Sequence, residues 1–190
     1  MFQRWIVMSL TILACSIGSS RAFADVGHER AYEFDGTHVA LSIERFMGID
    51  YTDIEGPSEG KATARFLLNA SEPVPTSLAR FGVDVFLGRL SLGLAGGFTS
   101  QDVGIIAPRV GYLIGLTPTL GLWLRGGGFY AATPGGKWAG LTAEALLGWF
   151  PYSNIALHLG PTLDLAFATE DNRPDYVSIG IPEVGMTVFL

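Results

Sequence analysis

Large apolar residues alternate with small or polar residues along most of this chain. Between Val39 and Leu190 the apolar side chains recur at every second position in about eight short segments, such as Leu120-Gly-Leu-Trp-Leu-Arg-Gly. Successive side chains of a β-strand point to opposite faces, so each segment has one apolar face and one small or polar face. The pattern predicts an all-β protein whose eight strands span residues 38–51, 77–87, 90–99, 105–116, 120–131, 139–150, 155–167 and 177–190.

The connections between these strands alternate in length. Tight turns are expected at Gly88-Arg89, Thr117-Pro118-Thr119 and Pro151-Tyr152-Ser153-Asn154. The other connections are generally longer: 52–76, 100–104, 132–138 and 168–176. An up-and-down arrangement of an even number of strands gathers the tight turns at one end and the longer loops at the other. Within the first loop, Ala62-Thr-Ala-Arg-Phe-Leu-Leu is predicted to extend the first hairpin.

The charged residues indicate which face of the strands points outward. Only 16% of the residues are charged, against about 25% in ordinary soluble domains. Nearly every charge within the strands lies on the face opposite the leucines, and Arg45 is an exception at a bulge or near an interface. A charge that faces lipid at mid-membrane costs about 2–4 kcal/mol, so we predict an eight-stranded antiparallel up-and-down transmembrane β-barrel with its leucines toward lipid. A soluble carrier of the lipocalin kind, with the two faces reversed, is the alternative.

The face assigned to the barrel interior carries nearly balanced charges. Eight strands enclose a space that side chains can just fill, and ion pairing can offset the cost of burying these groups. If a hairpin turns about Pro134-Gly135, Arg125 lies directly across from Glu144. The sequence therefore predicts a charged plug and no open pore. The predicted lumen network consists of Glu44, Arg80, Asp84, Arg109, Arg125, Glu144, His158, Asp164 and Glu183.

The first residues have the features of an export signal. Arg4 precedes a short apolar core, and Ala22-Phe23-Ala24 matches an A-x-A cleavage site. We expect residues 1–24 to be removed as a signal peptide and residues 25–190 to form a single domain. Cleavage before Cys15 as a lipoprotein, and an uncleaved anchor helix, are the alternatives.

The predicted mature chain is acidic and has no cysteine. Cys15 is the only cysteine and lies in the leader, so no disulfide or thiolate metal site is expected. Removal of Arg4 and Arg21, with no acid lost, moves the net charge from −6 to −8. Acidic residues cluster in the connections between strands. This balance argues against nucleic acid as a partner.

Aromatic residues lie near both ends of the predicted strands. Tyrosine and tryptophan favour the headgroup layer of a membrane, so two girdles are predicted. The girdle near the loops comprises Tyr51, Phe98, Tyr130, Trp138, Phe167 and Tyr176. The girdle near the turns comprises Phe86, Trp149, Phe150, Tyr152 and Phe189.

These features together resemble a known family. The leader, the eight alternating strands, the tight turns opposite longer acidic loops and the final strand Val184-Gly-Met-Thr-Val-Phe-Leu190 look like the small outer-membrane β-barrels of Gram-negative bacteria, the outer-membrane protein A and X family. The resemblance is architectural and covers nearly the whole mature chain. It implies location in the outer membrane, contact with outer-membrane lipid and insertion by the barrel-assembly machinery. This chain ends in Phe189-Leu190, whereas those proteins usually end in an aromatic residue.

Three prolines, Pro108, Pro161 and Pro182, interrupt the predicted strands. Proline cannot donate to a strand ladder, and a closed barrel has no free edge on which to place it. A last hairpin centred near Asp171-Asn172 puts Pro161 opposite Pro182, both facing lipid. We expect either a weak lateral seam there, which resembles the wall openings of the outer-membrane palmitoyl transferase barrel, or a β-bulge.

One group of inward residues could be read as a hydrolase site. His158, Asp164 and Glu183 share the inward face of the last two strands, but a nucleophile is missing. Ser178 is predicted to point outward, and Thr162 has no evident oxyanion donor. Membership of a polar network is the simpler interpretation, so no catalytic residue is assigned.

No metal or cofactor site is evident in the sequence. His28 and His38 fit no metal-ligand spacing, and Gly126-Gly127-Gly128 lacks the lysine or helix that follows a phosphate loop. The sequence favours an integral outer-membrane barrel with a plugged polar lumen and acidic external loops, with a structural role or a role in binding an unknown extracellular ligand. A lipid-modifying enzyme and a narrow channel for small solutes are the alternatives.

Overall fold

The computed structural model describes residues 36–54, 61–66, 78–98, 102–170 and 173–190. Within these residues the strands are β1 Thr37–Ile54, β2 Lys61–Phe66, β3 Arg80–Leu87, β4 Leu90–Phe98, β5 Gly104–Thr117, β6 Leu120–Thr133, β7 Gly136–Tyr152, β8 Ile155–Ala168 and β9 Tyr176–Phe189. Their ends differ from the predicted ones by at most three residues. The predicted signal peptide, most of the first loop and Asp171-Asn172 lie outside the described residues.

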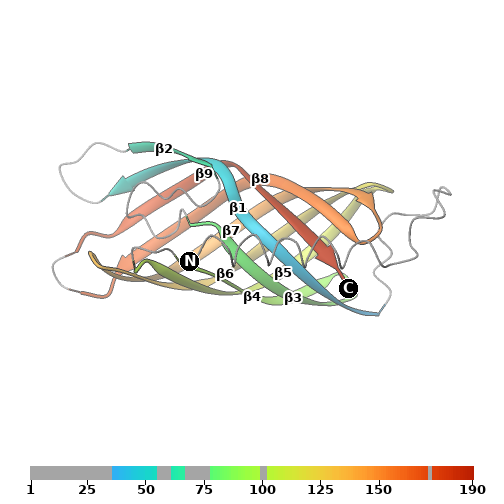
Figure 1. The fold of residues 1–190 in the computed structure, drawn as a ribbon, viewed down its shortest axis with the longest axis horizontal. Helices are drawn as coiled ribbons and strands as arrows, with labels where there is room; N and C mark the ends of the chain where they lie inside the picture. Colours follow the sequence, from blue (N-terminus) through green and yellow to red (C-terminus); the bar gives the residue numbers. More distant parts are fainter. Residues whose placement is uncertain (1–35, 55–60, 67–77, 99–101, 171–172) are drawn as a thin grey trace, which may run out of the picture.

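The strands form a closed antiparallel ring (Figure 1). Strands β1 and β3 to β9 follow one another in sequence order, and β9 pairs with β1 to complete a ring of eight. The extra strand β2 pairs with Met47–Thr52 of β1. This part of β1 follows Glu44, whose pair with Arg80 is the last one between β1 and β3. The predicted extension of the first hairpin is therefore confirmed. None of the described residues form a helix that is long and apolar enough to span a membrane.

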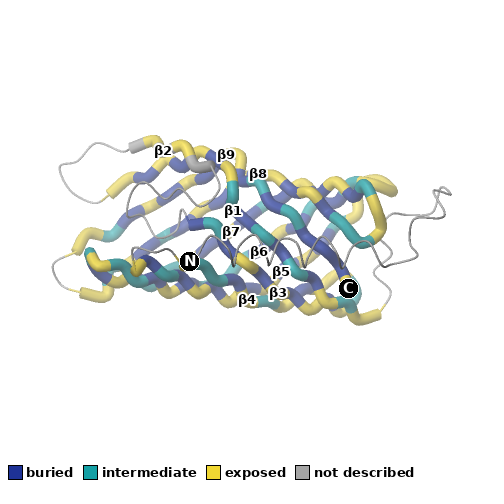
Figure 2. Tube along the Cα trace, in the orientation of Figure 1, coloured by how far each residue is buried: buried dark blue, intermediate teal, exposed yellow. Residues whose placement is uncertain are grey.

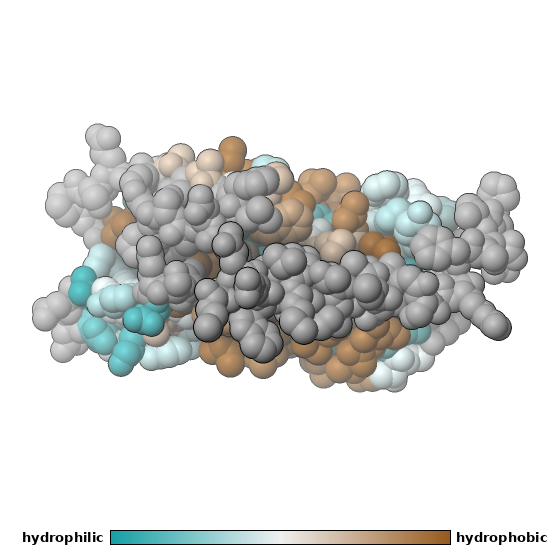
Figure 3. Space-filling view, viewed as in Figure 1, coloured by the Kyte–Doolittle hydropathy of each residue, from teal (hydrophilic) through white to brown (hydrophobic). Residues whose placement is uncertain are grey.

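Exposed and buried residues alternate along each strand (Figure 2). In β3, for example, Phe81 and Val83 are exposed while Arg80 and Asp84 are buried. Figure 3 shows the result on the part of the surface that is visible there, where apolar residues gather around the middle of the barrel and polar residues toward its ends. Exposed large apolar residues occur on every strand of the ring. The leucine face is thus the outer face, and the alternative with reversed faces is wrong.

A bulge in β1 brings Arg45 into the lumen. Residues 44–46 of β1 lie opposite Gly185 alone, between the pairs Ile43–Met186 and Met47–Val184. Arg45 has a φ of 53°, in the left-handed region, and its side chain is buried beside that of Glu44. The exception in the charge pattern is thus an inward residue that an irregular backbone displaces from strict alternation.

A second bulge corrects the predicted orientation of Ser178. On β9, Glu183 is buried, and strict alternation from Glu183 would place Ser178 outside. An additional residue at Ile181–Pro182 shifts the alternation by one position. Ser178 is therefore buried, and its Oγ lies 3.1 Å from Oγ1 of Thr52. The predicted outward orientation was wrong.

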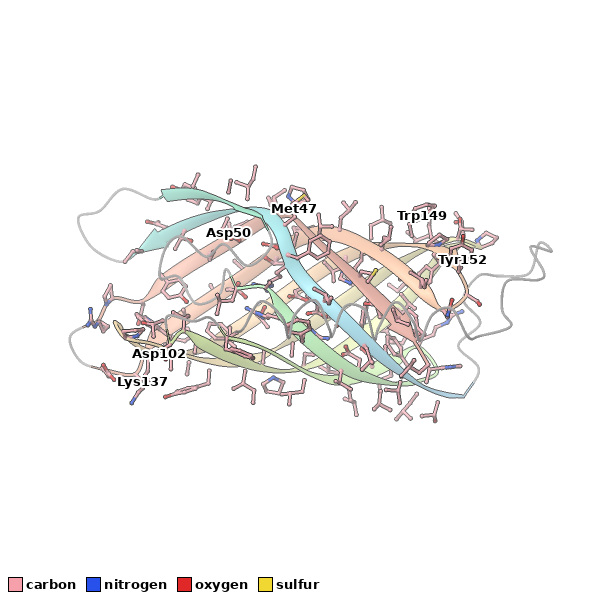
Figure 4. The ribbon with its side chains drawn as sticks, viewed as in Figure 1. Met47, Asp50, Asp102, Lys137, Trp149 and Tyr152 are labelled. Carbon is pink, nitrogen blue, oxygen red and sulfur yellow. The ribbon has the colours of Figure 1, made fainter. Side chains whose placement is uncertain are left out.

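The predicted girdles are also partly wrong. Tyr51, Phe98, Tyr130, Phe167, Trp149 and Tyr152 do lie on the outer surface. Figure 4 shows Trp149 and Tyr152 at the end with the tight turns, opposite the end with Asp102 and Lys137. The other five aromatic residues are buried inside the barrel: Phe86, Trp138, Phe150, Tyr176 and Phe189. Nearly half of the girdle assignment thus belongs to the core.

Candidate functional site

The barrel interior contains three layers along its axis. The turn-end cluster consists of Ala40, Phe86, Leu113, Trp123, Leu146, Phe150, Ala156 and Phe189. The loop-end cluster consists of Leu78, Ala95, Val103, Ile105, Ala107, Phe129, Ala131, Trp138, Ala166 and Tyr176. Between them lies the charged layer, which consists of Glu44, Arg45, Arg80, Asp84, Arg109, Arg125, Glu144, Asp164 and Glu183.

Glu44 of β1 joins two arginines in the charged layer. Its Oε1 accepts a hydrogen bond of 2.7 Å from Nη1 of Arg125, and its Oε2 accepts one from Nη1 of Arg109. Arg109 also forms an ion pair with Asp84, with its Nε 2.9 Å from Oδ1. The hydroxyl of Ser42 also donates a hydrogen bond to Oε1 of Glu44. Four strands, β1, β3, β5 and β6, are thereby linked through their side chains.

Arg45 joins the opposite wall to this group. Its Nη1 lies 2.6 Å from Oδ2 of Asp164, and its Nη2 lies 2.8 Å from Oε1 of Glu144. Glu144 also pairs with Arg125, its Cα partner across β6 and β7, so the predicted cross-strand pair is confirmed. The result is one continuous chain of ion pairs that runs Asp84–Arg109–Glu44–Arg125–Glu144–Arg45–Asp164.

All nine residues of the predicted lumen network are buried in the structure. Six of them belong to this chain of ion pairs. Arg80 lies opposite Glu44 in the β1–β3 ladder, and Glu183 lies opposite Gly160 in the β8–β9 ladder. His158 takes no part in these ion pairs, and its Nε2 contacts Oγ1 of Thr187. The network residue that the sequence missed is Arg45, and the membrane cost of an outward arginine was the signal that could have placed it inside.

Glycines on neighbouring strands make room for the large polar side chains. A Cβ on Gly93 would overlap the carboxylate of Asp84, and a Cβ on Gly185 would overlap the ring of His158. Because the interior of an eight-stranded barrel is narrow, each large inward side chain needs a small neighbour. A small cavity remains between Arg80, Arg109, Arg125, Thr142 and Glu144.

Ring contacts pack the turn-end cluster closely. The ring centroids of Phe86 and Trp123 are 5.2 Å apart, and those of Phe150 and Phe189 are 6.0 Å apart. The guanidinium of Arg125 lies 4.4 Å above the Trp123 ring. The charged layer therefore rests directly on this cluster through a cation–π contact.

Hydrogen bonds join the loop-end cluster and the end of β8 to the segment that precedes β9. Trp138 and Tyr176 meet edge to face with their centroids 6.0 Å apart. Nε1 of Trp138 donates to the carbonyl of Pro174 at 3.1 Å, and the amide of Ala168 donates to Asp175 at 2.7 Å. The start of β9 is thus held against β7 and β8 at the loop end.

No family model and no curated protein matches this sequence. Among solved structures, the chain is similar to Neisserial surface protein A, with a TM-score of 0.51 and 13% identity over 81% of this chain and 97% of that one. The chain has the fold of a small outer-membrane β-barrel. The N-terminal β-barrel domain of Pseudomonas aeruginosa OprF gives a TM-score of 0.43 at 12% identity, over 80% of this chain and 97% of that one. Ail of Yersinia pestis gives 0.43 at 10% identity, over 82% and 100%.

The predicted fold class, an eight-stranded antiparallel up-and-down transmembrane β-barrel, is confirmed. At 13% identity the likeness shows the fold and nothing finer.

The barrel does not assemble the hydrolase arrangement considered from the sequence. Nε2 of His158 lies 3.1 Å from Oγ1 of Thr187, while Asp164 is engaged by Arg45. His158 and Asp164 are six positions apart on β8, which corresponds to about 20 Å along a strand. Within the described part of the barrel, no three His, Cys, Asp or Glu side chains are grouped as metal ligands.

The contact between Trp123 and Ser91 gives a first prediction. Nε1 of Trp123 donates to Oγ of Ser91 at 3.1 Å, and both side chains are buried. Ser91→Ala is expected to lower the free energy of unfolding by about 1 kcal/mol, because it leaves a buried indole N–H without its acceptor. Urea titration followed by tryptophan fluorescence measures the loss. Ser153→Ala, at an exposed turn position, is the control and should change stability by less than about 0.5 kcal/mol. Equal effects would mean that the hydrogen bond adds nothing.

Proposed function

We propose that this protein is an integral outer-membrane protein in which a rigid closed barrel presents acidic loops to the exterior. The observation that carries the proposal is the closed ring with an apolar outer band and, among the described residues, charges at mid-height on its inner face. Hydrocarbon offers no partner for an open sheet edge, and a closed ring has none. The role is structural, or consists of binding an extracellular ligand through the loops.

Separation of cell envelopes by density tests this location. We expect the protein in the outer-membrane fraction. We also expect its gel mobility to change on heating, because a closed barrel resists detergent until it is heated. Recovery of the mature chain as a water-soluble monomer without detergent would contradict the proposal.

The lumen is proposed to be plugged. Two apolar clusters fill the ends of the barrel and the ionic chain crosses its middle, so a hydrated ion would have to displace packed aromatic rings and break ion pairs. In planar bilayers the purified protein is therefore expected to show no unitary conductance, while a porin measured in the same bilayers serves as the positive control. Stable channels in the presence of this protein would favour the channel alternative.

Two partners follow from the same proposal. Outer-membrane lipid would surround the apolar band, and the barrel-assembly machinery would insert the chain by way of the last strand. In that strand Phe189 packs inside the turn-end cluster.

A further inference from the structure

The wall of the barrel is irregular at β9. Between the pairs Gly160–Glu183 and Thr162–Gly180, the single residue Pro161 of β8 faces the two residues Ile181 and Pro182 of β9. This is the β-bulge considered from the sequence. Neither proline has an N–H to donate, so the β8–β9 ladder lacks donors where its register changes.

The other side of β9 is irregular at the same height. Between the pairs Met47–Val184 and Asp50–Gly180, residues 48–49 of β1 face residues 181–183 of β9. The bulge at residues 44–46 of β1 affects the pairing of β9 on one side only. The other register shifts in the described strands, at Gly115/Thr117 and Trp149/Tyr152, lie beside tight turns. The segment around Ile181–Pro182 is therefore the place where one strand loses regular pairing to both neighbours away from the barrel ends. Local opening is easiest where backbone pairing is weakest.

The two sides of the wall differ sharply at this point. On the outside, Met47, Pro161, Ile181 and Pro182 are all exposed, and Ile181 is 57% exposed. Figure 4 shows Met47 near the middle of the barrel's length, far from both ends. The outer rim of the irregular segment is thus wholly apolar and lies at the level of the acyl chains.

On the inside, a hydroxyl lies directly behind the bulge. Thr162 is only 3% exposed, and its Oγ1 has no hydrogen-bond partner among the described residues. A Cβ built on Gly180, the residue before the bulge, would lie 2.7 Å from this Oγ1 and would overlap Oε1 of Glu183. A buried hydroxyl without a partner costs about 1–3 kcal/mol, so a ligand that supplies the missing hydrogen bond would be favoured.

We infer that the wall opens laterally at Pro161 and Pro182 and that the opening binds a neutral amphiphile with a hydroxyl headgroup, such as a long-chain alcohol or a monoacylglycerol. The alkyl chain of this ligand lies against the apolar rim, and its hydroxyl headgroup reaches Oγ1 of Thr162. A neutral headgroup fits because the charged layer holds five acids and four arginines, and the buried Asp50 of β1 lies opposite Gly180 beside the bulge, which disfavours a further anion. The inference rests on the proposed membrane location.

Access through the wall is tested with single cysteines. Thr162→Cys is compared with Ser91→Cys, a buried lumen position on β4, both in a Cys15→Ser background. A maleimide that carries a dodecyl chain and is dissolved in the bilayer is expected to label the Thr162→Cys variant at least ten times faster than the Ser91→Cys variant, once each shows normal heat-dependent gel mobility. Equal rates overturn the inference. Faster labelling of the thiol at position 162 by a charged, water-soluble maleimide than by the dodecyl reagent also overturns it, because access would then come from the barrel ends.

The headgroup is tested on the protein with its natural threonine. In lipid nanodiscs, 1-dodecanol is expected to shift the amide NMR signals of residues 159–163 and 179–184, and Thr162→Val should weaken this binding at least fivefold. Thr52→Val, a buried lumen threonine at the loop end, is the matched control and should leave it unchanged. Equal shifts with dodecane, or no effect of Thr162→Val, overturn the site. If these binding tests fail while the protein is found in the outer-membrane fraction, the inferred binding site is wrong and the proposed location stands. If the protein is absent from that fraction, the proposed location is wrong.

Discussion

Replacement of Glu144 by alanine is expected to lower the free energy of unfolding by about 3–5 kcal/mol. The Glu144 side chain is 4% exposed and its carboxylate pairs with both Arg45 and Arg125, so its removal leaves two buried guanidinium groups short of a counter-charge. It also cuts the ionic chain in the middle, which separates Arg45 and Asp164 from the group around Glu44. Urea unfolding in detergent micelles measures the loss, and the temperature of the gel-mobility change should fall with it.

The matched control is Glu170→Ala at the loop end. Glu170 is exposed and lies 3.9 Å from Nζ of the exposed Lys137. An exposed pair of this kind contributes about 0–1 kcal/mol, since water screens it. Similar losses for the two variants, or an unchanged temperature of mobility change in Glu144→Ala, would contradict a stabilising role for the ionic chain.

The sequence predicted the features of the barrel that depend on regular alternation. Strand faces and the ring of eight follow from a period of two, and the pair Arg125–Glu144 follows from a turn centred on Pro134-Gly135. The expectation that 132–138 is one of the longer connections was wrong, because β6 and β7 continue to Thr133 and from Gly136 and leave a two-residue turn. Arg45 and Ser178 were misplaced because of bulges. Arg45 lies within the bulge of β1, which leaves the even positions inward on both sides of it, whereas the single extra residue in β9 reverses the orientation of Ser178. The position of a bulge depends on tertiary packing, which alternation along one strand does not report.

The lumen aromatics were missed for a different reason, since the signal was present. Phe86 is two residues from Asp84, Phe150 is six from Glu144 and Phe189 is six from Glu183. Each even separation places the aromatic on the same inward face as the charge. Their position near strand ends suggested a girdle, but the face decides whether such a residue meets lipid or the lumen. Tyr176, beyond the bulge in β9, needed the structure to be placed.

The inner and outer surfaces of the barrel have opposite distributions along its axis. Outside, the apolar band lies in the middle and polar residues lie at the ends, whereas inside the charges lie in the middle and apolar clusters lie at the ends. The clusters keep water away from the ionic chain, and low polarity strengthens each of its hydrogen bonds and raises the cost of any unpaired group. The same arrangement that stabilises the closed barrel therefore makes it intolerant of losing one partner.

A charge placed on the outer face tests which medium surrounds the barrel. Val110 lies midway along β5, faces outward and is 48% exposed. Val110→Arg is expected to destabilise the barrel in lipid vesicles by about 2–4 kcal/mol, because the guanidinium would lie at the level of the acyl chains. Reversible urea unfolding from vesicles measures this loss.

Leu116→Arg, on the same strand, is the control that distinguishes the effect of depth in the membrane from the other effects of introducing an arginine. Leu116 faces outward like Val110 and is 54% exposed, but it lies one residue from the end of β5 at a tight turn. In a membrane its loss should be only about 0–1 kcal/mol, since the side chain reaches the headgroup layer. In water, both positions would be ordinary exposed sites, and both variants would stay within about 0.5 kcal/mol of the parent protein. A difference of roughly 2 kcal/mol between two arginines on one face of one strand therefore requires hydrocarbon around Val110, and its absence would remove the physical basis for the proposed location.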